Sequence, residues 1–369
     1  MRIAAFNLQN LFDRARAFNE PNDVARKVLA DTAALNALFE WGNYTERRKQ
    51  RMLALIGELG LTRSDRGPYV LLRQVRGRVI RRGAGGPTIV ASGRDDWVGW
   101  VEAKTETVNE RSVDNTGRVI RDVNADILAV AEAEDRIALQ MFSELVLERV
   151  DGRPYDHVML IDGNDDRGID VGVMTKAGFD IGDMRSHIDD VDSQGRAIFS
   201  RDCPEYAITT PGGERVWVLP NHFKSKFGGN SRSSRSRRRA QAARAAEIYR
   251  GLRRAGEDLV VVLGDFNDTP DSAPLTPLLA STDLRDVSEF ERFDTGEFAG
   301  RGTFGLGNDN QKLDYVLLSP ALFRRVTAAG LFRKGAWPGR RPKRWSVYPE
   351  ITHPVHVASD HHVIWVDID

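Results

Sequence analysis

Cysteine is almost absent from this sequence, and so are long hydrophobic runs. The single cysteine, Cys203, excludes an internal disulfide framework and a cysteine-rich zinc site. No stretch approaches the ~20 apolar residues of a membrane-spanning helix. The N-terminal residues become polar too early for a signal peptide. We therefore expect a cytoplasmic protein that has no membrane partner.

A surplus of charge is also missing. The 369 residues include 53 Lys and Arg and 53 Asp and Glu, so the formal net charge is +0. A hydrophobic share of 41% and a charged share of 29% are typical of globular proteins. The length allows one large domain or two small ones. Any binding of a polyanion must come from local basic clusters, because no global field favours it.

The most informative stretch is residues 260–270, VVVLGDFNDTP. Its aliphatic start predicts a buried strand, and Gly264 permits a tight turn or a close approach. Asp265 and Asn267 are two residues apart, so in an extended segment their side chains share one side. A carboxylate beside an amide could orient and deprotonate a water molecule. The alternative is a strand followed by an Asx turn, which needs no catalytic role.

Other expected strands also end in polar side chains. Carboxylates suit Mg²⁺, which prefers oxygen ligands, whereas a histidine near amides and lysines suits a phosphate. The residues concerned are Asn7 after residues 2–6, Glu132 within 125–133, Asn221, His222 and Lys224 after 216–220, Asp314 within 312–318, and Asp360 and His361 before 363–366. Each of them could also serve only as a turn residue or a structural polar group.

Basic residues concentrate in three segments. Arginines at 73–82 fall within residues 61–108, where glycines and short apolar runs predict strands and tight turns. Nine arginines and only one acid, Glu247, occupy residues 231–254, and the alanine-rich part from 240 predicts a helix after a mobile leader at 231–236. Residues 333–345 mix cations with Trp337 and Trp345, as a loop that stacks on a base would. Each segment could also be a solvated surface.

In their order and spacing these motifs resemble the endonuclease/exonuclease/phosphatase family, which includes pancreatic-type deoxyribonuclease and abasic-site endonucleases. The resemblance spans nearly the whole chain and rests on Asn7, Glu132, Asn221-His222, Gly264-Asp265-Phe266-Asn267, Leu313-Asp314-Tyr315 and Ser359-Asp360-His361. It implies an α/β fold, a four-layer α/β/β/α sandwich of two packed mixed β-sheets with outer helices. We expect one such domain over residues 1–369, with a basic strand-rich insertion at about 61–108 and a basic loop at about 331–345.

The resemblance also implies a role for each site residue. Glu132 would bind Mg²⁺, or Mn²⁺ as an alternative, with support from Asn7 and Asp360. The implied catalytic residues are Asp265 acting on the attacking water, Asn267 positioning the water or the phosphate, His361 with Asp314 fixing its tautomer, and His222 stabilising charge on the phosphate. Weaker candidates for phosphate contact are Arg167, Asn221 and Lys224. The chain departs from the common family pattern at Ala131 and Asp135, where many members have Gln and Asn.

The leading functional hypothesis is a Mg²⁺-dependent phosphodiester hydrolase acting on nucleic acid, with DNA slightly ahead of RNA, through one-step attack by an activated water. One alternative is a phosphatase or phosphodiesterase for a small or lipid phosphate. Lys312-Leu313-Asp314-Tyr315 stands where phosphoinositide phosphatases of this family would have Trp-Cys-Asp-Arg, which weakens the lipid alternative. Another alternative is a catalytically silent nucleic-acid-binding protein. Oligomeric state does not follow from the sequence.

Overall fold

The chain folds into two compact units in a computed structural model. Unit 1 comprises residues 1–12, 108–225 and 231–369, and unit 2 comprises residues 13–107 and 226–230. The structure describes residues 1–9, 11, 13–15, 22–107, 109–165, 168–226, 231–340 and 342–369. Unit 2 begins at Asp13, ahead of the insertion expected at about 61–108.

Unit 1 is built on two large mixed β-sheets. In spatial order, the seven-stranded sheet contains β16 (Phe293–Asp294), β18 (Val326–Phe332), β19 (Val363–Ile368), β1 (Arg2–Asn7), β8 (Ile127–Ala133), β10 (Asp170–Thr175) and β9 (His157–Leu160). The six-stranded sheet contains β11 (Asp180–Arg185), β12 (Glu205–Thr209), β13 (Arg215–His222), β14 (Val260–Asp265), β17 (Asp314–Leu318) and β15 (Arg285–Asp286).

The two sheets pack face to face through one layer of alternating side chains. Ile3 and Ala5 of β1 join a core with Val261 and Leu263 of β14, while the intervening Ala4 lies in a different core. Because successive side chains of a strand point to opposite faces, each central strand serves two cores. This explains why residues 260–263 are apolar without interruption.

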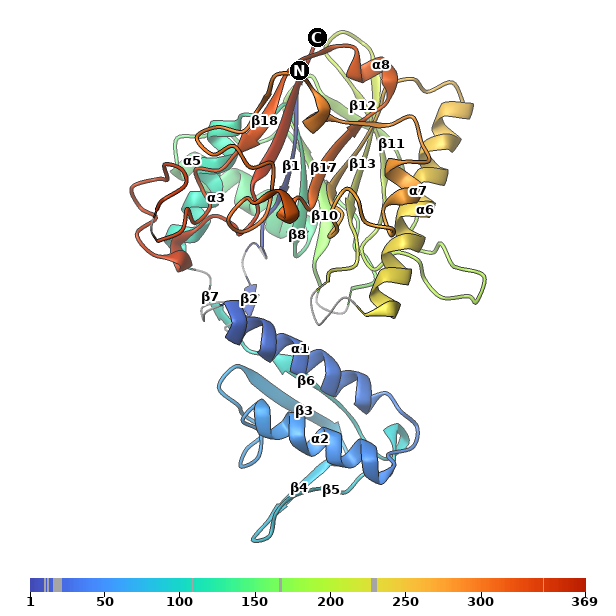
Figure 1. Cartoon of the computed structure of the whole chain (residues 1–369), viewed down its shortest axis with the longest axis vertical. Coiled ribbons are helices and arrows are strands. Elements are labelled where there is room, and N and C mark those ends of the chain that lie inside the picture. The colour runs from blue at the N-terminus through green and yellow to red at the C-terminus, as the bar shows by residue number, and fades with distance from the viewer. Residues whose placement is uncertain are drawn as a thin grey trace. The chain divides into compact units, whose positions relative to one another are not determined.

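Helices cover the outer face of each sheet. Figure 1 shows α3 (Glu110–Val123) and α5 (Leu147–Arg149) on one side of the strands, and α6 (Arg232–Arg254) and α7 (Thr276–Leu279) on the other. The expected four-layer sandwich is therefore confirmed in unit 1. The remaining helical segments of this unit are α4 (Arg136–Met141), the π-helical η3 (Phe142–Val146), α8 (Pro320–Phe323), and the 3-10 turns η4 (Val287–Glu289), η5 (Asp309–Gln311) and η6 (Pro354–His356).

Helix α6 corrects one expectation. The segment 231–236, expected to be a mobile leader, is the first turn of the helix. The helix begins at Arg232, and the Ser231 hydroxyl caps it by accepting a hydrogen bond from the Ser234 N–H. A serine at this position satisfies a backbone N–H that has no partner within the helix.

Unit 2 has a hydrophobic core of its own, formed by residues between 28 and 101. Helices α1 (Asn22–Phe39) and α2 (Glu46–Glu58) pack on strands β3 (Val70–Arg76) and β6 (Val98–Ala103). The unit also contains β2 (Asp13–Ala15) paired with β7 (Thr105–Thr107), the hairpin of β4 (Ile80–Gly83) and β5 (Gly86–Ile89), and the turn η2 (Arg94–Asp96). The apolar side chains of Met52, Leu55 and Ile56 in α2, and of Leu59 after it, are buried.

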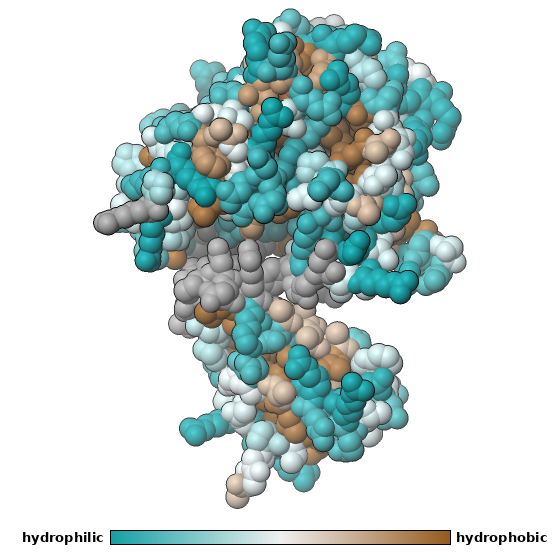
Figure 2. Space-filling view, in the orientation of Figure 1, coloured by the Kyte–Doolittle hydropathy of each residue, from teal (hydrophilic) through white to brown (hydrophobic). Residues whose placement is uncertain are grey.

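The surfaces of both units that face the viewer in Figure 2 are mainly hydrophilic, with small separate hydrophobic areas. Among the described residues, no helix is long and apolar enough to span a bilayer.

Candidate active site

The topology of unit 1 brings six chain segments to one edge of the two sheets. Strand β1 runs parallel to β8, and β13 runs parallel to β14, so each pair ends at the same edge. Strands β17 and β19 run antiparallel to β14 and β1, so their first residues lie at this edge too. In the register, Asp265 faces His222 on one side and Asp314 on the other. Residues far apart in the sequence thereby form one polar cluster.

The Asp265 carboxylate is the centre of this cluster. It is 2% exposed, and its Oδ2 accepts hydrogen bonds from the side-chain amides of Asn7 at 3.1 Å and Asn267 at 3.0 Å. His222 Nε2 lies 3.5 Å from the same oxygen and His361 Nε2 lies 3.8 Å from it. Burial raises the pKa of Asp265 to about 7, with the His361 charge opposing this shift and the Asp314 charge adding to it. Asp265 is thus a base whose pKa matches neutral pH.

Two unusual backbone conformations orient this carboxylate. Gly264 has φ 124°, and a Cβ placed there would lie 2.1 Å from the Asn221 carbonyl oxygen, so only glycine fits. Asn267 has φ 54°, and its N–H donates to Asp265 Oδ1 at 2.8 Å. The Asx turn that was the alternative to a site is therefore present. It forms part of the site, because it fixes the Asp265 carboxylate.

His361 and Asp314 form a buried pair beside Asp265. His361 Nδ1 lies 2.8 Å from Asp314 Oδ2, which leaves Nε2 directed toward Asp265. Burial alone would lower the pKa of His361, but the charges of Asp314 and Asp265 outweigh it and raise that pKa well above its usual value. His361 is consequently an imidazolium at neutral pH and can donate to an anionic oxygen.

Glu132 reaches the site through a β-bulge. Opposite β8, Asp170 pairs with Ala133 and Val171 with Ala131, so Glu132 is the extra residue, and its φ is 63°. Bulges redirect a side chain relative to the regular pleat. The Glu132 side chain is 19% exposed, and its Oε1 lies 3.8 Å from His222 Nε2. Among the described residues, no group donates a hydrogen bond to this carboxylate.

A divalent cation could be held either by the buried group of Asp265, Asp314 and His361 or by the partly exposed Glu132. Asp265, Asp314 and His361 each offer a ligand atom within 4.8 Å of the others. The Glu132 carboxylate, however, has open coordination positions, whereas His361 Nδ1 is already paired with Asp314. Because Mg²⁺ prefers oxygen ligands and retains several waters, the partly exposed Glu132 fits such an ion better than the buried set. Asp360 is half-buried, and its N–H donates to Gln9 Oε1 at 3.0 Å.

Two of the weaker phosphate candidates, Asn221 and Lys224, make other described contacts. The Asn221 side chain is buried on the other face of β13 from His222, and its Nδ2 donates to the Leu219 carbonyl oxygen at 3.0 Å. Lys224 is half-buried, and its N–H donates to Gln241 Oε1 at 2.8 Å. Arg167 lies outside the described residues, so its candidacy stays a prediction. Asp170 is buried in β10, where burial raises its pKa to about 7.

Most arginines of the two basic clusters in unit 1 bind other parts of the same chain. In α6, Arg238 is fully buried and lies 2.9 Å from Asp268, and Arg244 lies 2.7 Å from Asp190. Arg333 is buried, and its guanidinium donates to backbone carbonyl oxygens, including that of Gly302 at 3.0 Å. Trp345 is also buried, and its Nε1 donates to Ala336 O at 3.1 Å. These residues hold loops together and are not available to grip a polyanion.

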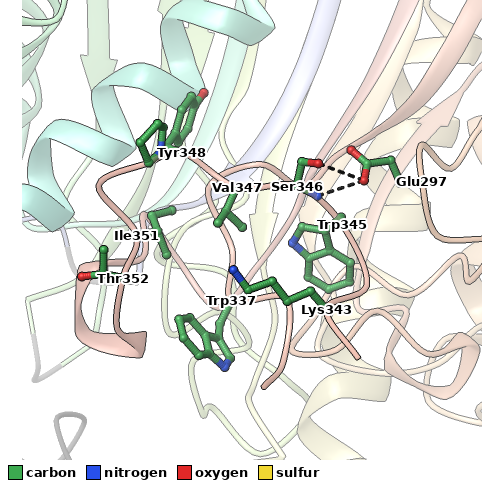
Figure 3. Close-up of a pocket in the computed structure, with 10 residues that line it drawn as sticks. Glu297, Trp337, Lys343, Trp345, Ser346, Val347, Tyr348, Ile351 and Thr352 are labelled. Atoms are coloured by element: carbon green, nitrogen blue, oxygen red, sulfur yellow. Dashed lines mark hydrogen bonds between the residues drawn. The ribbon is translucent and has the colours of Figure 1, made fainter. Parts of the chain in front are cut away.

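The basic loop borders a pocket of about 730 Å³. Figure 3 shows Trp337, Lys343 and Trp345 around it, with Ser346 hydrogen-bonded to Glu297. The described lining includes none of the proposed catalytic side chains. The Trp345 ring lies 5.0 Å from the ring of His362, the residue that follows His361. The pocket is therefore near the catalytic segment without being the reactive centre.

Several supporting contacts at the site were not predicted from the sequence. The Thr303 hydroxyl accepts hydrogen bonds from the N–H groups of Leu313 and Asp314, at 2.9 and 2.8 Å. Lys312 is buried and lies 2.9 Å from Asp286, beneath the Asp314 segment. Ser359 Oγ donates to the Asn7 carbonyl oxygen at 2.7 Å and so ties the start of β19 to the end of β1. The contacts of a hydroxyl or a lysine give no signal in the sequence until the strands are paired.

Comparison with known proteins agrees with this architecture. Two solved structures from Bacteroides thetaiotaomicron share the fold. One is a mannosyl-6-phosphatase, with a TM-score of 0.51 and 17% identity over 70% of this chain and 91% of the other. The second is an endonuclease/exonuclease/phosphatase family protein, with a TM-score of 0.50 and 18% identity over 70% and 85%. No curated protein matches the sequence significantly.

The model of the Endonuclease/Exonuclease/phosphatase family matches residues 108–361, which is more than half of the chain and covers all the site segments except the one that ends at Asn7. The resemblance noted in the sequence is confirmed. The chain belongs to the Endonuclease/Exonuclease/phosphatase family, whose members are hydrolases that act on phosphoester bonds.

Proposed function

We propose that this protein is a divalent-metal-dependent phosphodiester hydrolase whose substrate is nucleic acid. The observation that carries the proposal is the arrangement around Asp265 Oδ2, with two amides in hydrogen-bond contact and two histidines within 4 Å. In-line attack on a phosphodiester needs a base for the water, compensation of charge on the non-bridging oxygens, and help for the leaving oxygen. The cluster provides a group for each task.

Each side chain then has one role. Asp265 takes the proton of the attacking water, because its pKa of about 7 lets it be ionised near neutral pH and still bind a proton. His361, held as an imidazolium by Asp314, donates to a phosphate oxygen or to the leaving oxygen. His222 lies between Asp265 and Glu132 and donates to a second phosphate oxygen.

Glu132, with Asn7 and Asp360 nearby, is the proposed holder of Mg²⁺ or Mn²⁺. When bound, the cation would neutralise negative charge on the phosphate. Nucleic acid as the substrate is supported by basic residues that have no described carboxylate partner, such as Arg232, Arg235 and Lys343. DNA is the first substrate to test and RNA the second.

A second candidate is hydrolysis of a small phosphate ester. One observation favours it: most arginines of α6 and of the 331–345 loop are used in contacts within the protein. Fewer free cations are then left for a long phosphate backbone than the sequence suggested. The shared fold with a phosphatase does not decide the matter, because the identity is only 17%.

The test is cleavage of supercoiled plasmid, single-stranded DNA and RNA with Mg²⁺ or Mn²⁺, beside EDTA and beside the Asp265→Ala and His361→Ala variants. We expect cleavage by the wild type, and loss in EDTA and in both variants of about 10²-fold or more. Asp271→Ala, which removes an exposed carboxylate close in sequence, is the matched control and should cut normally. Hydrolysis of bis(p-nitrophenyl) phosphate or p-nitrophenyl phosphate without any cleavage of polynucleotides would establish the second candidate.

A further inference from the structure

Unit 2 carries an open, basic, aromatic β-surface that the proposed chemistry does not use. Strands β3 and β6 form a two-stranded sheet whose inner side chains, including Val70, Leu72 and Val101, are buried against α1 and α2. The opposite face holds Arg73, Val75, Arg76, Val98 and Trp100, and we call it the outer β3–β6 face. Within the described part of unit 2, its residues Arg73, Val75, Arg76 and Trp100 are exposed and Val98 is half-buried.

The exposure of Trp100 and Val75 is unusual for such side chains. Trp100 is 45% exposed and Val75 is 67% exposed. Trp100 lies directly opposite Arg73 in the register, and a bulge at Val75 breaks the regular pairing of β3 with β6. A strand face that only meets solvent gains nothing from an indole, whereas a flat exposed ring on a sheet is a stacking platform.

Cations outnumber acids in this unit. Residues 13–107 contain 17 Lys and Arg against 12 Asp and Glu, although the whole chain has equal numbers of each. Arg76, Arg78 and Arg81 are exposed, and none of them has a carboxylate partner among the described residues. Three nearby carboxylates are already engaged: Glu102 pairs with Arg73, Asp65 with Arg82, and Asp96 accepts from Ser92.

The turn after β3 holds the free arginines at the end of the sheet. Gly77 has φ 70°, and a Cβ there would lie 2.3 Å from the Asp96 carbonyl oxygen. This tight turn leaves Arg76 and Arg78 on either side of Gly77, next to the outer β3–β6 face. Arginine presents several donors in a planar fork that matches phosphate oxygens.

We propose that the outer β3–β6 face binds single-stranded nucleic acid, with a base stacked on Trp100 and the backbone phosphates held by Arg76, Arg78 and Arg81. A single strand is favoured over a duplex because only unpaired bases expose a face to an indole. The local surplus of positive charge matches the phosphate backbone. The inference does not rest on the catalytic proposal, since binding needs neither metal nor Asp265.

The test measures binding of the full-length protein to fluorescent 20-nucleotide oligo(dT), oligo(rU) and a duplex of equal length, in EDTA so that no strand is cut. We expect tighter binding of the single strands. Trp100→Ala should weaken it about tenfold, while Trp100→Phe, which keeps an aromatic face, should bind nearly as well as the wild type. Trp41→Ala is the matched control. Trp41 lies just after α1 and is also exposed, at 52%, but its ring stacks with the Arg48 guanidinium.

Salt dependence tests the phosphate contacts separately. Replacing Arg76 and Arg78 by alanine should reduce the slope of log affinity against log salt by roughly 1.4, about 0.7 for each contact to a single strand. Arg47→Ala with Arg51→Ala removes two exposed arginines from α2, which covers the other side of the sheet, and should leave the slope unchanged.

Each result decides the proposal. Equal affinity of Trp100→Ala and the wild type, with an unchanged circular dichroism spectrum, would overturn it, as would equal binding of duplex and single strand or a failure to bind any oligonucleotide. These binding experiments do not measure cleavage. A protein that binds single strands here but cuts no substrate in the cleavage test would therefore refute only the catalytic proposal.

Discussion

The carboxylates of Asp265 and Glu132 belong to one site but have unlike surroundings. Asp265 is 2% exposed and receives amide hydrogen bonds, whereas the Glu132 side chain is 19% exposed and receives none from the described residues. Two carboxylates in different environments can take different roles. In the proposed function Asp265 is the base and Glu132 is the metal ligand. The backbone of Glu132, at φ 63°, is strained, and such strain concentrates at functional positions.

Replacing Glu132 by glutamine tests the ligand role. Glutamine keeps the shape but removes the charge, so we expect phosphodiester hydrolysis to fall at least about 100-fold and the metal concentration for half-maximal rate to rise. The measurement is rate against Mg²⁺ and Mn²⁺ concentration. Glu148→Gln, at a position in α5 outside the site, is the control. An unchanged metal titration in Glu132→Gln would remove Glu132 from the ligand set.

A second buried histidine links stability to pH. His187 lies between Glu205 Oε1, at 2.7 Å, and Asp190 Oδ2, at 2.9 Å, and these carboxylates in turn contact Arg185 and Arg244. Burial opposes the charged ring, but the hydrogen bond to Glu205 and the charges of both carboxylates outweigh it and raise the pKa of His187. Its stabilising effect is therefore complete below the unfolded-state pKa of about 6.5 and is lost as the pH rises through the higher folded-state pKa.

We expect His187→Gln to lower the free energy of unfolding more at about pH 5.5 than at about pH 9. Urea unfolding of the wild type and the variant at both pH values measures this. Other titrating groups, such as Asp170, cancel in the difference between the two proteins. A loss of equal size at both pH values would show that His187 acts by packing alone.

Residue identities at the site were largely predictable, and side-chain directions were not. Asp265, Asn267, His361 and Glu132 lie at or beside strand ends in a recognisable order, and the structure gathers them. Asn221 is adjacent to His222, yet the alternation of β13 turns it to the other face, and only the register of paired strands settles which face is which. The bulge that directs Glu132 also has no signature in the sequence.

At the scale of elements, the turn after β14 positions the base. Gly264→Ala would place a Cβ 2.1 Å from Asn221 O at φ 124°, so we expect it to cost at least about 2 kcal/mol of stability and most of the activity. Gly251→Ala in α6 is the matched control: no atom lies within 4 Å of the added Cβ, and an alanine should stabilise the helix by about 0.5–1 kcal/mol. Denaturant unfolding of both variants separates the outcomes. Equal stabilities would mean that the turn tolerates a side chain.

Helix α6 shows why composition alone cannot tell how many arginines are left to contact a polyanion. An arginine looks the same in the sequence whether it faces solvent or a buried carboxylate. Arg238 is fully buried against Asp268, and breaking such a pair is costly because it leaves a buried charge uncompensated. Three arginines in a row, 237–239, therefore divide among different partners, which only the three-dimensional packing determines.

At the scale of the whole molecule, one stretch of the chain holds both a surplus of positive charge and a hydrophobic core of its own. Residues 13–107 carry the positive surplus, and the core of unit 2 is drawn entirely from residues 28–101. The sequence predicts strands and tight turns at residues 61–108 but does not show that α1 and α2 share a core with them, because an amphipathic helix shows which of its faces is buried and not which core buries it. That is why unit 2 begins at Asp13 and not near residue 61.

Separate cores predict that the catalytic unit folds without unit 2. Replacing residues 13–107 with a glycine-serine linker should leave cooperative thermal unfolding and hydrolysis of bis(p-nitrophenyl) phosphate within about threefold of the wild type, because Asp265, Glu132, His222 and His361 all belong to unit 1. Binding of single-stranded DNA should weaken at least as much as in Trp100→Ala. Loss of the small-substrate activity in a folded deletion protein would mean that unit 2 contributes to the reactive centre. An unfolded deletion protein would mean that the core of unit 1 depends on unit 2.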